Sequence, residues 1–97
     1  MSKILVVDDD AMNLRMAEVF LKKAGHEISK ASSGMEGISI LKADTYDLVL
    51  LDIEMPELNG FKTLEMIRED ASTANTRVVF PMILYTSSIP LKRFDQS

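Results

Sequence analysis

Short apolar runs alternate along the chain with stretches whose apolar residues recur at helical spacing. Ile4 to Val7 and Leu48 to Leu51 are continuous apolar runs, which are typical of strands covered on both faces. His26 to Ala31 is predicted to be a weaker strand with one polar face. Val78 to Tyr85 is predicted to be a last apolar strand that Pro81 interrupts. The pattern therefore predicts four strands with helices between them.

The first predicted helix runs from Ala11 to Ala24, and Gly25 is a natural stop just past its last turn. Its apolar positions recur every three or four residues, so they are expected to face the sheet. These positions are Ala17, Phe20, Leu21 and Ala24.

Two further helices are predicted later in the chain. Ser33-Gly34-Met35-Glu36 fits a capping box at the start of the second helix, which ends near Ala43 and directs Ile38 and Leu41 inward. Asn59 and Gly60 lead into the third helix. This helix carries an apolar side made of Phe61, Leu64 and Ile67.

The resulting order is β-α-β-α-β-α-β, which predicts an α/β fold with a parallel sheet flanked by helices on both faces. Ligands of such sheets sit beyond the carboxyl ends of the strands. Asp8 and Asp9 end the first strand and Asp52 ends the third, so the three carboxylates are expected to share one pocket. They cannot all stay ionised without a counter-charge, and Mg²⁺ suits a site of few carboxylates plus water.

Each acidic residue also has a simpler interpretation. Asp10 is expected to cap the first helix, since a short acceptor side chain satisfies free amides there. Asp8 and Asp9, or Asp52 alone, could be solvated charges at strand ends. The combination is more specific, because two separate apolar strands end in carboxylate at equivalent positions.

Composition excludes several classes of protein. The chain has 97 residues, 46% of them hydrophobic and 27% charged, which fits one globular domain. It has no cysteine, and its net charge of −4 argues against a nucleic-acid surface. No apolar stretch approaches the roughly 20 residues that span a membrane, and MSKILVV lacks the architecture of a signal peptide. We expect a cytoplasmic protein that binds neither nucleic acid nor membrane.

Three motifs resemble those of the response-regulator receiver domains of two-component signalling. They are VVDDD at 6–10, SSGMEGISIL at 32–41 and LDIEMPELNGF at 51–61. The resemblance implies a flavodoxin-like three-layer α/β/α fold with strand order 2-1-3-4. It also implies that Asp52 accepts a phosphoryl group from a histidine kinase or phosphotransfer protein. Asp8, Asp9, Asp52 and the backbone carbonyl of Glu54 would then hold Mg²⁺.

The resemblance weakens toward the C-terminus. Receivers continue with a fifth strand, which carries a lysine followed by proline, and a fifth helix. We expect both elements to be missing here, because Pro90-Leu91-Lys92 has the wrong order and comes too early. The chain is thus predicted to be one receiver domain, 1–97, in which 87–97 form a divergent tail. Thr86 is the expected phosphoryl-sensing residue, although alignment without an insertion would place Met82 there.

A sheet without a fifth strand would leave strand four as an open edge. We expect its apolar residues, Phe80, Ile83, Leu84 and Tyr85, to lose their cover. A homodimer through residues 78 to 97 would restore it. The sequence favours a phosphoacceptor signalling domain that is not an enzyme and acts by protein contact. A non-switching, receiver-derived dimerisation module is the alternative, and a phosphatase using Asp52 as a transient nucleophile is a third interpretation.

Overall fold

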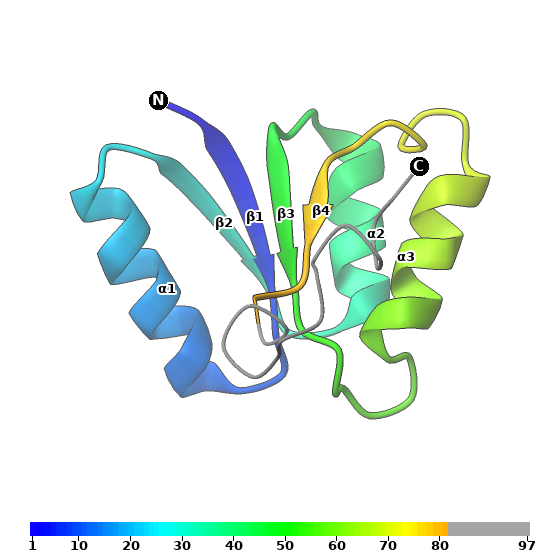
Figure 1. Ribbon diagram of the computed structural model, residues 1–97, viewed down its shortest axis with the longest axis horizontal. Coiled ribbons are helices and arrows are strands. Elements are labelled where there is room, and N and C mark those ends of the chain that lie inside the picture. Colours follow the sequence, from blue (N-terminus) through cyan, green and yellow to red (C-terminus); the bar gives the residue numbers. More distant parts are fainter. Residues whose placement is uncertain (82–97) are drawn as a thin grey trace, which may run out of the picture.

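The protein alternates strands and helices along its whole described length (Figure 1). The structure is a computed structural model, and it describes residues 1–81. The elements are β1 (Lys3–Val7), α1 (Ala11–Lys23), β2 (Glu27–Ala31), α2 (Gly34–Ala43), β3 (Leu48–Leu51), α3 (Gly60–Glu69) and β4 (Val78–Val79). The first five match the predicted elements to within one residue at each end, and α3 begins where it was predicted to begin.

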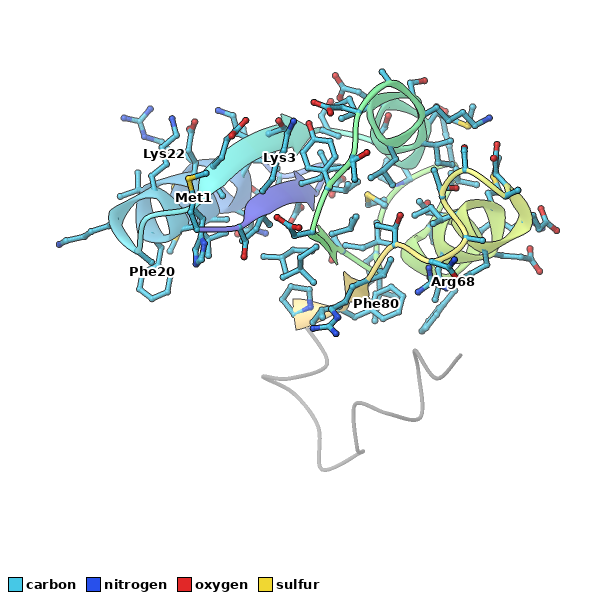
Figure 2. The ribbon with its side chains drawn as sticks, turned by 90° about the horizontal axis from the view of Figure 1, so that it is seen from above. Met1, Lys3, Phe20, Lys22, Arg68 and Phe80 are labelled. Atoms are coloured by element: carbon cyan, nitrogen blue, oxygen red, sulfur yellow. The ribbon has the colours of Figure 1, made fainter. Side chains whose placement is uncertain are left out.

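The four strands form one parallel sheet in the order β2-β1-β3-β4. Helix α1 lies on one face of this sheet, and α2 and α3 lie on the other (Figures 1 and 2). The result is the flavodoxin-like three-layer fold with the strand order that the sequence predicted. The expected lack of a fifth strand and helix concerns residues beyond the described part of the chain.

The hydrophobic core lies between the sheet and the α2–α3 layer. Partners in a parallel sheet point to the same side, and the register pairs Leu5 with Val49 and Val7 with Leu51. All four side chains are buried, as are Ile38 and Leu41 of α2 and Ile67 of α3, as predicted. This core fixes β1 and β3 side by side, with their carboxyl ends at one edge of the sheet.

The predicted inward face of α1 is wrong at two positions. Phe20 is 75% exposed and points away from the sheet (Figure 2), and Ala24 at the helix end is exposed too. The half-buried positions that face the sheet include the predicted Ala17 and Leu21, together with Leu14 and Glu18. Glu18 can lie there because Lys30 on β2 forms an ion pair with it at 2.9 Å. Sequence spacing missed this, since only the apolar positions were predicted to face the sheet.

The predicted helix starts and the predicted stop are confirmed. The carboxylate of Asp10 accepts hydrogen bonds from the first turn of α1, and the Asn59 side chain accepts from Lys62 N at 2.9 Å. Gly25 has a φ of 95°, a left-handed conformation that favours glycine after a helix. These side-chain and backbone signals explain why the helix boundaries could be predicted well.

The capping box at α2 forms in one direction only. Ser33 Oγ accepts from Glu36 N at 3.1 Å, as predicted. The Glu36 carboxylate, however, accepts from the backbone N–H of Ser32 at 2.6 Å rather than from that of Ser33. The return hydrogen bond therefore ties the strand–helix connection, not the capping residue, to the first turn.

Strand β4 is shorter than predicted. It covers Val78 and Val79 only, followed closely by Pro81, which cannot donate a backbone hydrogen bond. Phe80 was expected to lose its cover, but it is fully buried and its ring lies 5.3 Å from that of Phe61. The prediction for Phe80 is therefore wrong. Ile83, Leu84 and Tyr85 lie outside the described residues.

Candidate functional site

The carboxyl ends of β1 and β3 place aspartates side by side. Asp8 directly follows β1, and its N–H donates to Ala31 O on β2 at 3.0 Å. Asp52 directly follows β3, and its N–H donates to Val7 O at 2.9 Å. These backbone hydrogen bonds extend the sheet by one residue on each strand. Both aspartates are thereby fixed at the same edge.

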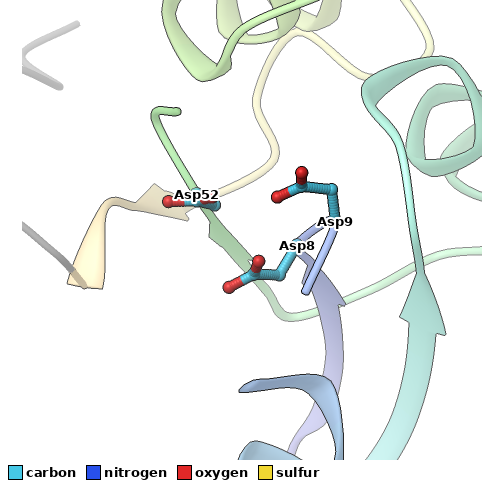
Figure 3. A group of neighbouring side chains, drawn as sticks. All are labelled: Asp8, Asp9 and Asp52. Carbon is cyan, nitrogen blue, oxygen red and sulfur yellow. The ribbon is translucent and has the colours of Figure 1, made fainter. Parts of the chain in front are cut away.

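Asp9 completes a cluster of three carboxylates at this edge. One carboxylate oxygen from each of Asp8, Asp9 and Asp52 lies within 4.8 Å of the other two (Figure 3). Asp8 and Asp52 are half-buried and Asp9 is exposed, so the cluster opens to solvent. The predicted meeting of the three side chains is confirmed, while their individual roles stay predictions.

Burial and the neighbouring carboxylates disfavour the charged form of Asp52. Burial raises the pKa of the Asp52 carboxyl above its ordinary value of 3.8, and the charges of Asp8 and Asp9 raise the pKa further. Backbone N–H groups of Glu54 and Ile53 partly oppose this by donating to the carboxylate. An added cation would relieve the repulsion. Three carboxylates open to water are the hard oxygen ligands that Mg²⁺ prefers, so the donor set fits this ion.

Two hydrogen bonds hold the Asp8 side chain. Asp10 N donates to Asp8 Oδ1 at 2.9 Å, and Asn13 Nδ2 donates to Asp8 Oδ2 at 3.2 Å. Asp10 itself turns away and caps α1, with its Oδ1 2.8 Å from Met12 N. Asn13 was not predicted as a site residue. Asn13 could have been found from its position, because it lies on the first turn of a helix that begins right after the aspartates.

Gly60 lets α3 approach the backbone of Asp52 closely. A Cβ at this position would lie 2.3 Å from Asp52 O and 2.7 Å from Ile53 Cα. The N–H of Gly60 also donates to Ile53 O at 2.8 Å, which closes the loop between β3 and α3. Any side chain at position 60 would push this loop, and Asp52 with it, out of place.

The same loop holds the other predicted site residue that the structure describes. Glu54 lies two residues after Asp52, and its backbone carbonyl stays a predicted ligand. Glu57 has a φ of 65°, a left-handed conformation that is unfavourable for a residue with a Cβ. Thr86, the predicted phosphoryl-sensing residue, lies outside the described residues.

Comparison with known proteins identifies the family. The model of the response regulator receiver domain matches residues 4–89. The chain belongs to this family. A relative, protein PilH of Pseudomonas aeruginosa, is 36% identical over 87 residues, which cover 90% of this chain and 69% of PilH. Receiver domains are signalling domains of two-component phosphorelays, which agrees with the prediction of a signalling domain.

Two other similar proteins are a much longer histidine kinase and a response regulator solved with a bound ligand. Histidine kinase 5 of Arabidopsis thaliana is 40% identical over 75% of this chain, which spans only 8% of that kinase. The solved structure of response regulator protein TrrA from Thermotoga maritima in complex with Mg²⁺-BeF has a TM-score of 0.76 and 34% identity. That match covers 82% of this chain and 68% of TrrA. Receiver domains generally bind Mg²⁺ and work with histidine kinases or phosphotransfer proteins.

The described helices are 10 to 13 residues long. Within residues 1–81, none of them combines the length and the apolar character that crossing a bilayer requires.

Proposed function

We propose that this receiver accepts a phosphoryl group on Asp52 from a histidine kinase or phosphotransfer protein. The observation that carries the proposal is the meeting of Asp8, Asp9 and Asp52, from two strands, within 4.8 Å. Asp52 follows the inner strand β3 and is half-buried, so its carboxylate is both fixed and reachable. Asp8 shares these two features, and the choice of Asp52 as the acceptor rests on the family resemblance of the motif at 51–61. An aspartate in this position is a competent nucleophile.

The chemistry is an exchange of one bond to phosphorus for another. A carboxylate oxygen of Asp52 attacks the phosphorus of a phosphohistidine on the partner protein. The new O–P bond forms as the N–P bond breaks, and the electron pair stays on the imidazole nitrogen of the partner. Asp52 keeps the phosphoryl group as a signal and does not turn over as an enzyme would.

We propose that Asp8, Asp9, Asp52 and the backbone carbonyl of Glu54 hold a Mg²⁺ ion during this step. When bound, the ion supplies positive charge that offsets the negative charge of the transferring phosphoryl oxygens. The raised pKa of Asp52 supports the need for such a counter-charge. The residues of the chain supply the oxygen ligands and hold them at one edge of the sheet.

The remaining predictions concern the extent and assembly of the receiver. We propose that residues 1–97 act as one receiver unit with a divergent tail at 87–97. The family match over 4–89 supports the receiver unit but not the start of the tail at 87. Thr86 is proposed to sense the phosphoryl group. A homodimer through residues 78 to 97 stays a proposal, supported by the place of β4 last in the described strand order. Sedimentation should show a dimer that Leu84→Asp weakens, and a monomer at high concentration would contradict it.

The decisive experiment for the proposed function is intact mass after treatment with a small phosphodonor. With Mg²⁺ the chain should gain the mass of one phosphoryl group, and chelation of Mg²⁺ should prevent the gain. Asp52→Asn should abolish it, whereas Asp47→Asn, at the opposite end of β3, should not. A wild-type chain that stays unmodified, or an Asp52→Asn chain that still gains the group, would refute the proposal.

A further inference from the structure

Asn13 is the only side chain on α1, among residues 1–81, with a recorded hydrogen bond to a carboxylate of the cluster. Its Nδ2 donates to Asp8 Oδ2 at 3.2 Å, while the backbone N–H of Asp10 donates to Asp8 Oδ1 at 2.9 Å. Each oxygen of the Asp8 carboxylate thus receives one hydrogen bond from the start of α1. Each oxygen also keeps a second lone pair for another ligand.

The two hydrogen bonds restrain a side chain that its neighbours repel. Asp8, Asp9 and Asp52 carry like charges within 4.8 Å, so a freely rotating Asp8 carboxylate would turn away from the other two. Donors on both oxygens fix the plane of the carboxylate instead. Hydrogen bonds of this kind to metal-binding carboxylates orient the ligand and typically account for 10–100-fold in metal affinity.

Within residues 1–81, the side-chain amide of Asn13 makes no hydrogen bond other than the one to Asp8. The backbone N–H of Asn13 is already satisfied by Asp10 Oδ1 at 3.3 Å, so the side chain is not needed to cap α1. Asn13 is exposed, and asparagine is a poorer helix former than alanine, so neither packing nor helix propensity explains it. The hydrogen bond to Asp8 is the contact that remains.

We propose that Asn13 is a positioning residue that holds the Asp8 carboxylate ready for a divalent cation. The inference rests on the proposed Mg²⁺ site and adds a residue from α1 to it. It makes the first turn of α1 part of the site: Asp8 reaches its position from β1, but its orientation comes from the helix.

The test is a Mg²⁺ titration of the ¹⁵N-labelled full chain, followed by the amide resonances of Asp9, Ile53 and Glu54. Asn13→Ala should raise the dissociation constant about tenfold, the low end expected for an outer hydrogen bond at an exposed site. Met12→Ala is the matched control, because it changes a neighbouring exposed side chain on the same turn without changing charge. The control should bind Mg²⁺ as the wild-type chain does.

A double substitution separates positioning from a general effect on α1. In an Asp8→Ala background, Asn13→Ala should cause no further loss of affinity, because the side chain that Asn13 orients is gone. The side-chain amide resonances of Asn13 should also shift with Mg²⁺ in the wild-type chain and not in Asp8→Ala. The proposal is overturned if Asn13→Ala binds Mg²⁺ as tightly as the wild-type chain does. It is also overturned if Asn13→Ala loses as much Mg²⁺ affinity in the Asp8→Ala chain as in the wild-type chain.

Failure of the Mg²⁺ site itself would look different. If wild-type chain shows no saturable shifts at Asp9, Ile53 and Glu54, the proposed metal site is refuted, and this inference falls with it. If the wild-type chain binds Mg²⁺ there and Asn13→Ala binds it equally well, only the role of Asn13 is refuted.

Discussion

The backbone N–H of Asp52 donates to the carbonyl oxygen of Val7 at 2.9 Å, one residue beyond the end of β3. Because β1 and β3 are parallel, this single hydrogen bond sets Asp52 beside Asp8, the residue after Val7. Side chains alternate along a strand, so both carboxylates project to the side opposite the Val7–Leu51 pair of the core. The backbone register therefore holds like charges together.

The first prediction is that Asp52→Asn stabilises the protein in the absence of Mg²⁺. Burial and the charges of Asp8 and Asp9 raise the pKa of Asp52, so the folded state favours the neutral carboxyl. The stability of the wild-type chain should fall as the pH rises from 3.8 to the raised pKa, and stay lower above it. The asparagine variant should escape that fall. Urea unfolding with a chelator over a pH series measures the difference.

Asp44→Asn is the control of opposite sign. A hydrogen bond from Lys3 lowers the pKa of Asp44, followed by one from the N–H of Thr45. Its contribution to stability is therefore present above 3.8 and is lost as the pH falls through the lowered pKa. Asp44→Asn should destabilise the chain at neutral pH. A metal-free Asp52→Asn variant that is also destabilised there would contradict the prediction.

The second prediction concerns Gly60. A methyl group at this position would lie 2.3 Å from Asp52 O, a backbone atom that cannot rotate away. Gly60→Ala should cost about 2–3 kcal/mol of unfolding free energy, in the upper part of the range for overpacking, and should move the amide resonances of Asp52 and Ile53.

Gly25→Ala is the matched control for Gly60→Ala. Gly25 has a φ of 95° but open space around the position of a Cβ. The substitution should cost about 1–2 kcal/mol from its backbone conformation alone. It should leave the Asp52 resonances unchanged. Equal resonance changes in the two variants would mean that Gly60 has no special relation to Asp52.

The sequence predicted those features that depend on a strong local signal. Asp10 and Asn59 cap helices because their short side chains reach free backbone amides, whatever the rest of the fold does. The meeting of Asp8 with Asp52 follows from two apolar strands of a parallel sheet, since equivalent strand ends meet at one edge. The helix caps and the meeting of Asp8 with Asp52 could both be predicted without knowing which side chains contact each other in the folded protein.

The errors came from contacts that the sequence does not encode locally. Glu18 lies against the sheet because Lys30 on β2 offers an ion pair, while Phe20 faces solvent. Asn13 escaped notice for the same reason, because its role depends on where the Asp8 side chain points.

The third prediction is that Glu57→Gly stabilises the loop beside the site. The left-handed φ of 65° costs a residue with a Cβ about 1–2 kcal/mol, whereas glycine adopts it freely. Glycine loses more entropy on folding, so the expected net gain is about 0.5 kcal/mol. Glu57→Gln is the control, because it removes the charge and keeps the Cβ. Thermal unfolding should show a gain for glycine only, and an equal gain for both would assign the effect to charge.

The last prediction compares one substitution at two phenylalanines. Phe80 is fully buried against Phe61, whereas Phe20 on α1 is 75% exposed. Phe80→Ala should therefore cost about 3–5 kcal/mol of unfolding free energy, because it removes a buried ring and leaves a cavity beside α3. Phe20→Ala should change stability by less than about 0.5 kcal/mol, as surface substitutions usually do. Urea unfolding of both variants measures the contrast. A small loss of unfolding free energy in Phe80→Ala would support the sequence-based expectation that this side chain is uncovered. A large loss in Phe20→Ala would mean that the exposed face of α1 is covered in solution.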